Sequence, residues 1–220
     1  YDYLLSKKRG ELLNKIKSQG FSKNRHEIFE LILRLRQVCC HPVLATNSLP
    51  QEFLTPSLKM NTVVEDVVNL LDQGSKVIVF SQFTSVLNLL QKQIKESTQK
   101  ILRLDGSTKD REGVVESFQN CEDSVVLLCS LKAGGIGLNL TAADYVILYE
   151  PWWNEAVEQQ AIDRAHRLGR CGQVIAKRYL YAQTIEEKMH LLKKDKQRVF
   201  HHVFNEQSSW NDSDVEYLLS

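Results

Sequence analysis

Short apolar segments alternate with helical segments over most of this 220-residue chain, from residue 59 onward. The segment KVIVFS at 76–81 is a continuous apolar run with several β-branched residues, which is typical of a strand buried on both faces. We expect further strands at 101–104, 125–130, 145–150 and 174–181, and helices at 59–72, 84–97, 109–119, 154–167 and 184–204. This alternation predicts an α/β fold in which helices flank a parallel sheet.

The first 57 residues have a different pattern. Apolar residues recur near the helical period across 1–40, and Gly20 divides that stretch into two helices. His41 and Pro42 end the second helix, because proline disfavours helix in the residue before it. Residues 43–57 hold two prolines and no clear period, so we interpret them as a linker. We therefore divide the chain into a helical segment with its linker at 1–57, an α/β domain at 58–183, and a helix with an acidic tail at 184–220.

The composition excludes several classes of protein. Hydrophobic residues make up 43% of the chain and charged residues 25%, which is the balance of a globular protein rather than a disordered or fibrous one. No run of about 18 apolar residues occurs, so we expect no membrane partner. The chain opens without Met or a signal peptide, and its five cysteines show no metal-ligand spacing. We therefore expect the chain to be part of a longer intracellular protein and to lack a metal site. We favour a bacterial cytoplasm over a eukaryotic nucleus, because no histone-reading appendage is evident.

Charge is unevenly distributed. The net charge is +1, but it is +5 over residues 1–40, −6 over 41–158, +6 over 159–198 and −4 over 199–220. Two basic segments around an acidic one are compatible with a surface that binds a polyanion. They are equally compatible with ordinary solvated helix faces.

Two of the predicted strands end in small polar residues that lead into helices. Ser81 and Gln82 follow the strand at 76–81, and Gly106 and Ser107 follow the strand at 101–104. Ligands of open α/β sheets gather at the carboxyl ends of the strands, and free N–H groups at a helix start favour phosphate. Helix capping explains either segment alone, whereas two strands ending alike favour an anion site.

The third strand, at 125–130, ends in a glycine-rich segment. Ser130 and Lys132 are followed by three glycines within four residues, which allow a backbone to approach a phosphate or sugar closely. Leu140 stands where a dinucleotide-binding GxGxxG motif has its third glycine, so that kind of site is excluded.

Aromatic and basic residues follow the fourth strand. Trp153, the second of two adjacent tryptophans, could stack on a base or lie against a groove; the alternative is that one tryptophan is core and the other packs on a helix. Gln160, Arg164 and Arg167 share one face of the helix at 154–167, an arrangement suited to a transferring γ-phosphate. The alternative is a surface arginine face paired with acidic residues of the same helix.

Two motifs that ATP chemistry requires are missing. The sequence holds neither a GxxxxGK[ST] loop nor a DExx pair after an apolar strand. The chain thus has arginines suited to contact a phosphoryl group, but it lacks the phosphate-binding loop and the Mg²⁺-binding carboxylate that would hold the nucleotide.

Four stretches occurring in order give the chain a family resemblance: VIVFSQFTSVLNLL, LRLDGST, SLKAGGIGLNLTAADYVILYEPWWN and QQAIDRAHRLGR. They resemble the later helicase motifs of the Swi/Snf-type DNA-translocating ATPases of the second helicase superfamily. The resemblance implies a C-terminal RecA-like lobe, with residues 1–40 as a helical protrusion and 184–204 as a bracing helix. Arg170 departs from the glutamine usual in the family, and Lys132 from the usual arginine.

The resemblance also implies a role for each matching residue. Arg164 and Arg167 would be arginine fingers, Gly137 and Gln160 would face the nucleotide, and Trp153 would touch the duplex groove. Contacts to DNA phosphates would come from Ser81, Gln82, Gly106, Ser107, Ser130 and Lys132.

The implied activity is that of the second motor lobe of an ATP-dependent double-stranded DNA translocase or nucleoprotein remodeller. Its partners would be double-stranded DNA, the N-terminal lobe of the same protein and a DNA-bound protein. ATP and Mg²⁺ would be bound mainly by that N-terminal lobe, so we expect these 220 residues alone to be inactive. A lobe of a strand-separating helicase and a non-catalytic nucleic-acid-binding module are the alternatives.

Overall fold

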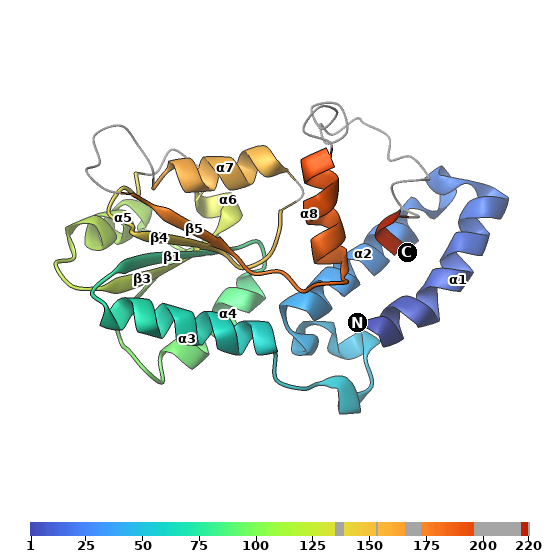
Figure 1. Cartoon of the computed structure of the whole chain (residues 1–220), viewed down its shortest axis with the longest axis horizontal. Coiled ribbons are helices and arrows are strands. Elements are labelled where there is room, and N and C mark those ends of the chain that lie inside the picture. The colour runs from blue at the N-terminus through green and yellow to red at the C-terminus, as the bar shows by residue number, and fades with distance from the viewer. Residues whose placement is uncertain (135–138, 153, 166–172, 196–216, 220) are drawn as a thin grey trace. The chain divides into compact units, whose positions relative to one another are not determined.

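The computed structural model describes residues 1–134, 139–152, 154–165, 173–195 and 217–219. The chain divides into two compact units, drawn in Figure 1. The α/β unit comprises residues 58–179, and the helical unit comprises residues 1–57 together with 180–220. The helical unit is thus discontinuous in sequence, with the whole α/β unit inserted between its two parts.

The α/β unit contains a five-stranded parallel sheet in the order β2-β3-β1-β4-β5. The strands are β1 (Lys76–Ser81), β2 (Ile101–Leu104), β3 (Val125–Ser130), β4 (Tyr145–Leu148) and β5 (Ile175–Arg178). The central strand β1 pairs with both β3 and β4, so Phe80 lies between Cys129 and Leu148. The predicted parallel sheet is confirmed. Strands β4 and β5 are shorter than expected. At β4 the apolar character marks burial rather than pairing, since Tyr149 is fully buried beyond the end of the strand.

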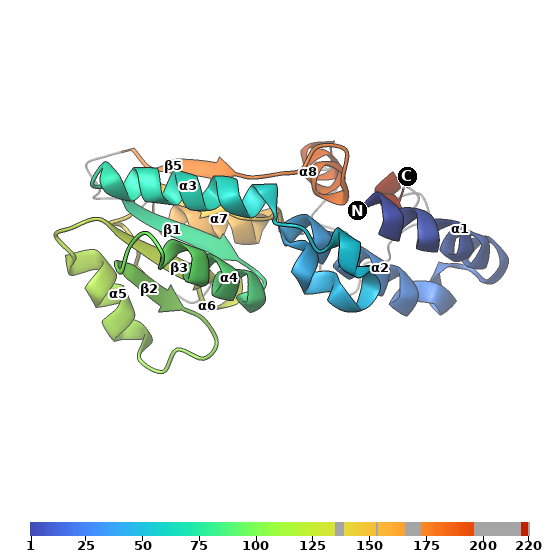
Figure 2. The same cartoon turned by 90° about the horizontal axis from the view of Figure 1, so that it is seen from below.

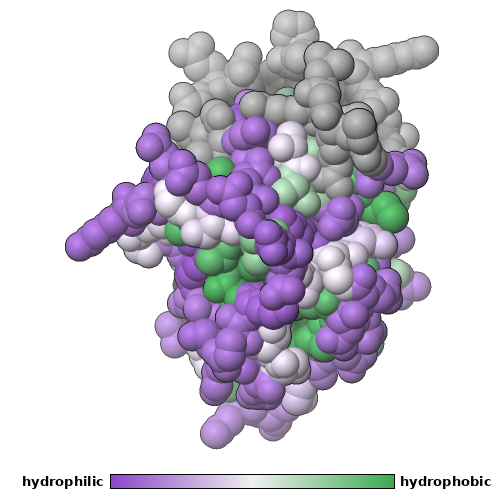
Figure 3. Space-filling model, turned by 90° about the vertical axis from the view of Figure 1, so that its left-hand side faces the viewer, coloured by the Kyte–Doolittle hydropathy of each residue, from purple (hydrophilic) through white to green (hydrophobic). Residues whose placement is uncertain are grey.

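Helices cover both faces of this sheet. Figures 1 and 2 show α3 (Leu58–Asp72) and α4 (Thr84–Ile94) against one face. The other face is covered by α5 (Arg111–Asn120), α6 (Leu131–Gly134) and α7 (Glu155–Asp163). On that second face Phe118, Ala133 and Ala161 pack with apolar residues of the strands in one core cluster. The surface at the amino ends of the strands is mainly hydrophilic, with apolar residues in small separate patches (Figure 3).

The helical unit is built around two long antiparallel helices. Its elements are α1 (Asp2–Gln19), α2 (Phe21–Cys40), the 3-10 helices η1 (Pro42–Ser48) and η2 (Gln51–Phe53), and α8 (Ile185–Asp195). The predicted break at Gly20 is confirmed, since that glycine has φ 80°, which L side chains rarely adopt. The hydroxyl of Tyr1 accepts a hydrogen bond from the backbone N–H of Ile185 at 2.9 Å, which ties α1 to the start of α8.

The structure corrects two sequence expectations and confirms a third, the start of the helix expected at 154–167. Residues 43–57 contain the helices η1 and η2 rather than a featureless linker, because such short 3-10 turns leave no readable period. The glycine-rich segment after β3 begins as the short helix α6. Helix α7 begins after Asn154, whose side chain caps it by accepting from Ala156 at 2.9 Å. The ends expected for the helices at 154–167 and 184–204 lie outside the described residues. No described helix is long and apolar enough to cross a bilayer.

A buried histidine connects α2 to η1. His41 is 8% exposed, and its Nδ1 accepts a hydrogen bond from the backbone N–H of Val43 at 3.2 Å. Burial lowers the pKa of His41 below its usual 6.5, because the charged imidazolium would lose hydration. Protonation would also remove the Nδ1 acceptor that caps η1. The folded protein therefore favours the neutral imidazole.

We expect stability to fall as the pH is lowered through about 6.5, because the unfolded chain then binds a proton that folded His41 resists. One proton limits the slope to about 1.4 kcal/mol per pH unit. His41→Asn keeps a capping acceptor and cannot titrate, so it is the matched control. In denaturant unfolding, the stability of wild type relative to this variant should be constant above about pH 7.5 and decline below about pH 6.5. A difference that does not vary with pH would contradict this assignment.

Candidate functional site

Residues following four neighbouring strands meet at the carboxyl edge of the sheet. Because the strands are parallel, the segments after β2, β3, β1 and β4 begin side by side. We call the segment at the end of β1 the β1 loop (residues 81–83) and the segment after β2 the β2 loop (residues 105–108). The structure thereby brings together the predicted phosphate contacts of three separate sequence segments.

The β1 loop is held by a buried carboxylate. Glu150, which follows β4 and is 3% exposed, accepts hydrogen bonds at one oxygen, Oε1, from the hydroxyl of Ser81 at 3.0 Å and the backbone N–H of Gln82 at 2.6 Å. Ser81 is fully buried, and its hydroxyl also accepts from the backbone N–H of Phe83 at 3.1 Å. The amide nitrogen of Gln82 is buried and has no hydrogen-bond partner among the described residues. Ser81 thus shapes this loop from within, while Gln82 offers a donor.

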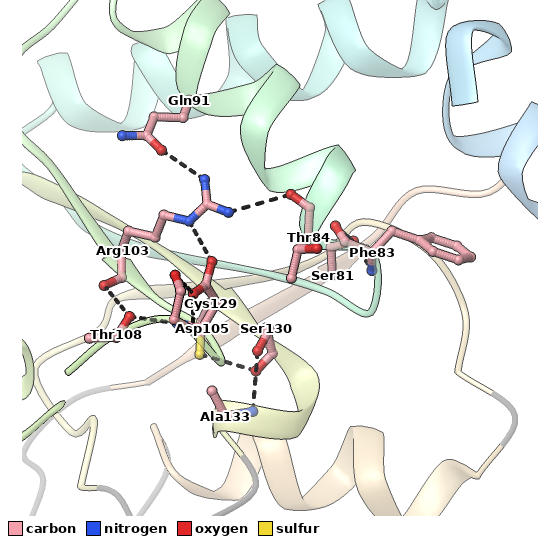
Figure 4. Close-up of polar contacts among 11 residues, drawn as sticks. Ser81, Phe83, Thr84, Gln91, Arg103, Asp105, Thr108, Cys129, Ser130 and Ala133 are labelled. Atoms are coloured by element: carbon pink, nitrogen blue, oxygen red, sulfur yellow. Dashed lines mark hydrogen bonds and ion pairs between the residues drawn. The ribbon is translucent and has the colours of Figure 1, made fainter. Parts of the chain in front are cut away.

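A second buried carboxylate holds the β2 loop (Figure 4). Asp105 is 2% exposed; its Oδ1 accepts from the backbone N–H of Ser107 at 2.8 Å and from the Ser107 hydroxyl at 2.6 Å. Its Oδ2 accepts from Nε of Arg103 at 2.7 Å. The Ser107 hydroxyl, followed by its N–H and Arg103, holds the pKa of Asp105 below its usual value, against burial, which raises it. Gly106 and Ser107 themselves are exposed, although the backbone N–H and the hydroxyl of Ser107 are both donated to Asp105.

The segment after β3 presents one exposed cation. The buried Ser130 caps α6 by accepting from the backbone N–H of Ala133 at 3.2 Å, whereas Lys132 is exposed. Gly137 lies outside the described residues. Beyond it, the backbone N–H of Leu140 donates to the carbonyl of Arg164 at 3.1 Å. The end of the glycine-rich segment and the end of α7 are therefore joined directly.

Helix α7 carries the remaining predicted residues. Gln160 is exposed, and Arg164, which caps the helix, is 7% exposed. The two residues expected on one face differ in exposure: Gln160 meets solvent, whereas Arg164 is buried where the backbone N–H of Leu140 donates to its carbonyl. Arg167 lies outside the described residues.

The tryptophan turn before α7 is also anchored by a carboxylate. Trp152 packs against the core cluster, and its backbone N–H donates to Oε1 of the buried Glu158 at 2.5 Å. The other oxygen of Glu158 accepts from Nε of Arg178 at 3.5 Å. Trp153, the predicted groove contact, lies outside the described residues. The side chain at 152 is therefore the core member expected of this tryptophan pair.

Sequence reasoning missed four supporting residues: Arg103, Asp105, Glu150 and Glu158. Two signals could have identified them. An arginine within the apolar strand ILRL needs an anion nearby, and Asp105 stands two positions later. A glutamate directly after a buried strand likewise needs donors. Among the described residues, no group of three or more His, Cys, Asp and Glu side chains is placed to hold a metal ion.

Comparison with known sequences identifies related proteins. Residues 59–169 match the helicase conserved C-terminal domain family. An uncharacterized ATP-dependent helicase of Mycoplasma pneumoniae is 39% identical over 198 residues, covering 89% of this chain and 19% of that protein. The chromatin-remodeling ATPase INO80 of Saccharomyces cerevisiae is 41% identical over 149 residues, covering 67% of this chain and 10% of that protein. The chain thus spans about a fifth or less of the length of these relatives.

Solved structures give a consistent result. The Sulfolobus solfataricus SWI2/SNF2 ATPase C-terminal domain has a TM-score of 0.69 and 28% identity, covering 98% of this chain and 87% of that one. The SWI2/SNF2 ATPase core of the same organism, in complex with double-stranded DNA, has a TM-score of 0.72 and 27% identity, covering 95% of this chain and 45% of that one. The likeness thus extends over nearly the whole chain.

We expect Asp105→Asn to lower the free energy of unfolding by about 1–3 kcal/mol at neutral pH, the range for losing hydrogen bonds to a charged group. Folding lowers the pKa of Asp105. Its contribution to the free energy of unfolding is therefore complete at pH values above the ordinary pKa of an aspartate, and it is lost as the pH falls through the pKa that Asp105 has in the folded protein. The cost of the substitution should therefore be constant from about pH 7 to about pH 4.5 and shrink below that.

Asp123→Asn is the matched control, since Asp123 is exposed and forms a surface ion pair with the exposed Lys100 at 3.2 Å. It should change stability by less than about 0.5 kcal/mol. Equal effects of the two substitutions would overturn the structural role of Asp105.

Proposed function

Because the chain belongs to the helicase conserved C-terminal domain family, in its Swi2/Snf2 type, we propose that it is the second motor lobe of an ATP-dependent double-stranded DNA translocase or nucleoprotein remodeller. One observation carries this proposal. The loops suited to phosphate lie together at the carboxyl edge of a RecA-like sheet, and the arginine-bearing helix α7 begins at that same edge and packs across one face of the sheet. Such a lobe needs to contact a phosphate strand and a nucleotide at the same time.

The nucleotide side of this lobe is α7 with the segment joined to it. ATP with Mg²⁺, bound mainly by the first lobe, would supply the transferable phosphoryl group. Arg164 and Arg167 would stabilise the charge that develops on that group, with Gln160 and Gly137 beside the nucleotide. The Leu140 bond at the carbonyl of Arg164 supports this role, since a finger acts best when its backbone is fixed.

The DNA side comprises the β1 loop, the β2 loop and Lys132. The exposed residues Gly106 and Ser107 and the cation of Lys132 would contact the phosphates of one strand, and Gln82 would join them once its buried amide turns outward. Ser81 and Ser130 would act beneath that surface by fixing the loops. Trp153 would lie against the duplex groove. Binding of this kind is independent of sequence and depends steeply on salt.

The proposed function also indicates which partners the whole protein would have. The similarity to INO80, a chromatin-remodeling ATPase, supports a DNA-bound protein as the displaced substrate. We place the protein inside the cell. The preference for a bacterial cytoplasm stays a prediction, since relatives come from a mycoplasma and from yeast.

The arginine fingers can be tested in the full-length protein. Double-stranded DNA should stimulate its ATPase without strand displacement. Arg164→Ala and Arg167→Ala should each lower kcat by about 10³-fold or more, the range for arginine fingers, with a smaller effect on nucleotide binding. Arg178→Ala, which removes an arginine paired with Glu158, is the control and should retain most turnover. Unchanged kcat in both finger variants would refute their assignment, and strand displacement would favour a helicase.

Lys132 can be tested by the salt dependence of DNA binding. Lys132→Ala should weaken binding to all sequences alike and reduce the slope of log Kd against log salt by about 1. Lys100→Ala removes an equal charge just before β2, at the opposite edge of the sheet, and should leave the slope unchanged. Equal slopes for wild type and Lys132→Ala would exclude Lys132 from the phosphate contacts.

A further inference from the structure

The side chain of Arg103 makes three hydrogen bonds at the carboxyl edge of the sheet. It lies on β2, and its side chain is 24% exposed. Nε donates to Oδ2 of Asp105 at 2.7 Å, Nη1 donates to Oε1 of Gln91 at 2.9 Å, and Nη2 reaches the carbonyl of Thr84 at 3.5 Å. Figure 4 shows this guanidinium between α4 and the β2 loop. Each of its three nitrogens therefore contacts a different residue.

These contacts join two loops that the sheet does not join. Strands β1 and β2 are not neighbours, because β3 lies between them. Thr84 is the first residue of α4 and directly follows the β1 loop. Asp105 holds Arg103 with one oxygen and Ser107 with the other, so the chain of contacts runs from Thr84 through Arg103 and Asp105 to Ser107.

We propose that Arg103 is a positioning residue that fixes the spacing between the β1 loop and the β2 loop, so that both meet successive phosphates of one DNA strand. This inference rests on the proposed function. Arg103 needs no phosphate contact of its own, because its donors are already directed to Asp105, Gln91 and Thr84. Preorganised spacing lowers the cost of ordering the loops when DNA binds.

The role requires a guanidinium. Arginine presents its donors in a rigid planar fork, whereas a lysine ammonium is a single point on a flexible stem. Arg103→Lys therefore keeps the charge but cannot reach the three acceptors with fixed geometry. Arg103→Gln removes both the charge and the fork. Comparing the two substitutions separates positioning from electrostatic attraction.

The test measures DNA-stimulated ATPase of the full-length protein. Both Arg103→Lys and Arg103→Gln should raise the DNA concentration for half-maximal stimulation about tenfold, which corresponds to the loss of about one charge-assisted hydrogen bond. The ATPase rate without DNA, the KM for ATP and the salt slope of DNA binding should stay as in wild type. Lys100→Gln is the control for charge, since Lys100 lies just before the same strand, and it should behave as wild type.

A milder variant covers the case in which Arg103→Gln impairs folding. Gln91→Ala removes the stronger of the two contacts between Arg103 and α4 and leaves those with Asp105 and Thr84. Gln91→Ala should also raise the DNA concentration needed for half-maximal stimulation. Combined with Arg103→Lys, it should cause no further increase in that concentration. An unchanged DNA requirement in Gln91→Ala and Arg103→Lys would overturn the proposal.

Other outcomes are equally decisive. Full activity of Arg103→Lys, or a salt slope lowered by about 1 in Arg103→Gln, would make Arg103 a direct phosphate contact instead. A parallel loss of DNA-independent ATPase and thermal stability in all these variants would reduce the role to general stability. A wild-type ATPase indifferent to DNA would overturn the proposed function as well, whereas a responsive wild type with normal Arg103 variants would overturn the positioning role alone.

Discussion

The pairing of β1 with β3 on one side and β4 on the other decides where every candidate residue of the α/β unit lies. Both ladders are parallel, so the strand ends coincide at one edge, and the register places Ser81 beside Ser130. Every residue of β3 is buried, and a shift of one residue would carry alternate side chains to the opposite face. Packing of both faces therefore fixes the register, and the register in turn fixes the spacing of the loops that follow the strands.

Buried carboxylates are the second common element of this edge. Asp105, Glu150 and Glu158 come from different segments, yet each is at most 3% exposed and each accepts a backbone N–H from a turn. They account for part of the acidic character of residues 41–158. That acidity is thus partly internal to the fold, which leaves the exposed Lys132 as a charge that an anion can meet at this edge.

The sequence patterns predicted the architecture well because the sheet is buried on both faces. Strands β1, β2 and β3 have the expected bounds, since continuous apolar runs flanked by polar turns have few other interpretations. The burial of Ser81 and Arg164 was not predictable in this way. Ser81 is hidden by a glutamate 69 residues away, and Arg164 by the return of the chain at Leu140. Local patterns give the residue at a strand end, whereas distant partners determine whether its side chain faces solvent.

The discontinuity of the helical unit has a consequence for the order in which the chain can assemble. As the chain emerges during synthesis, α1 and α2 can pair at once, but α8 follows only after all five strands. The central strand β1 likewise waits for β3, more than forty residues later, before its first ladder can close. The α/β unit can thus be complete while the helical unit still lacks its last helix. The bond between Tyr1 and Ile185, which joins the two sequence-distant parts of that unit, can close only after the whole α/β unit has been synthesised.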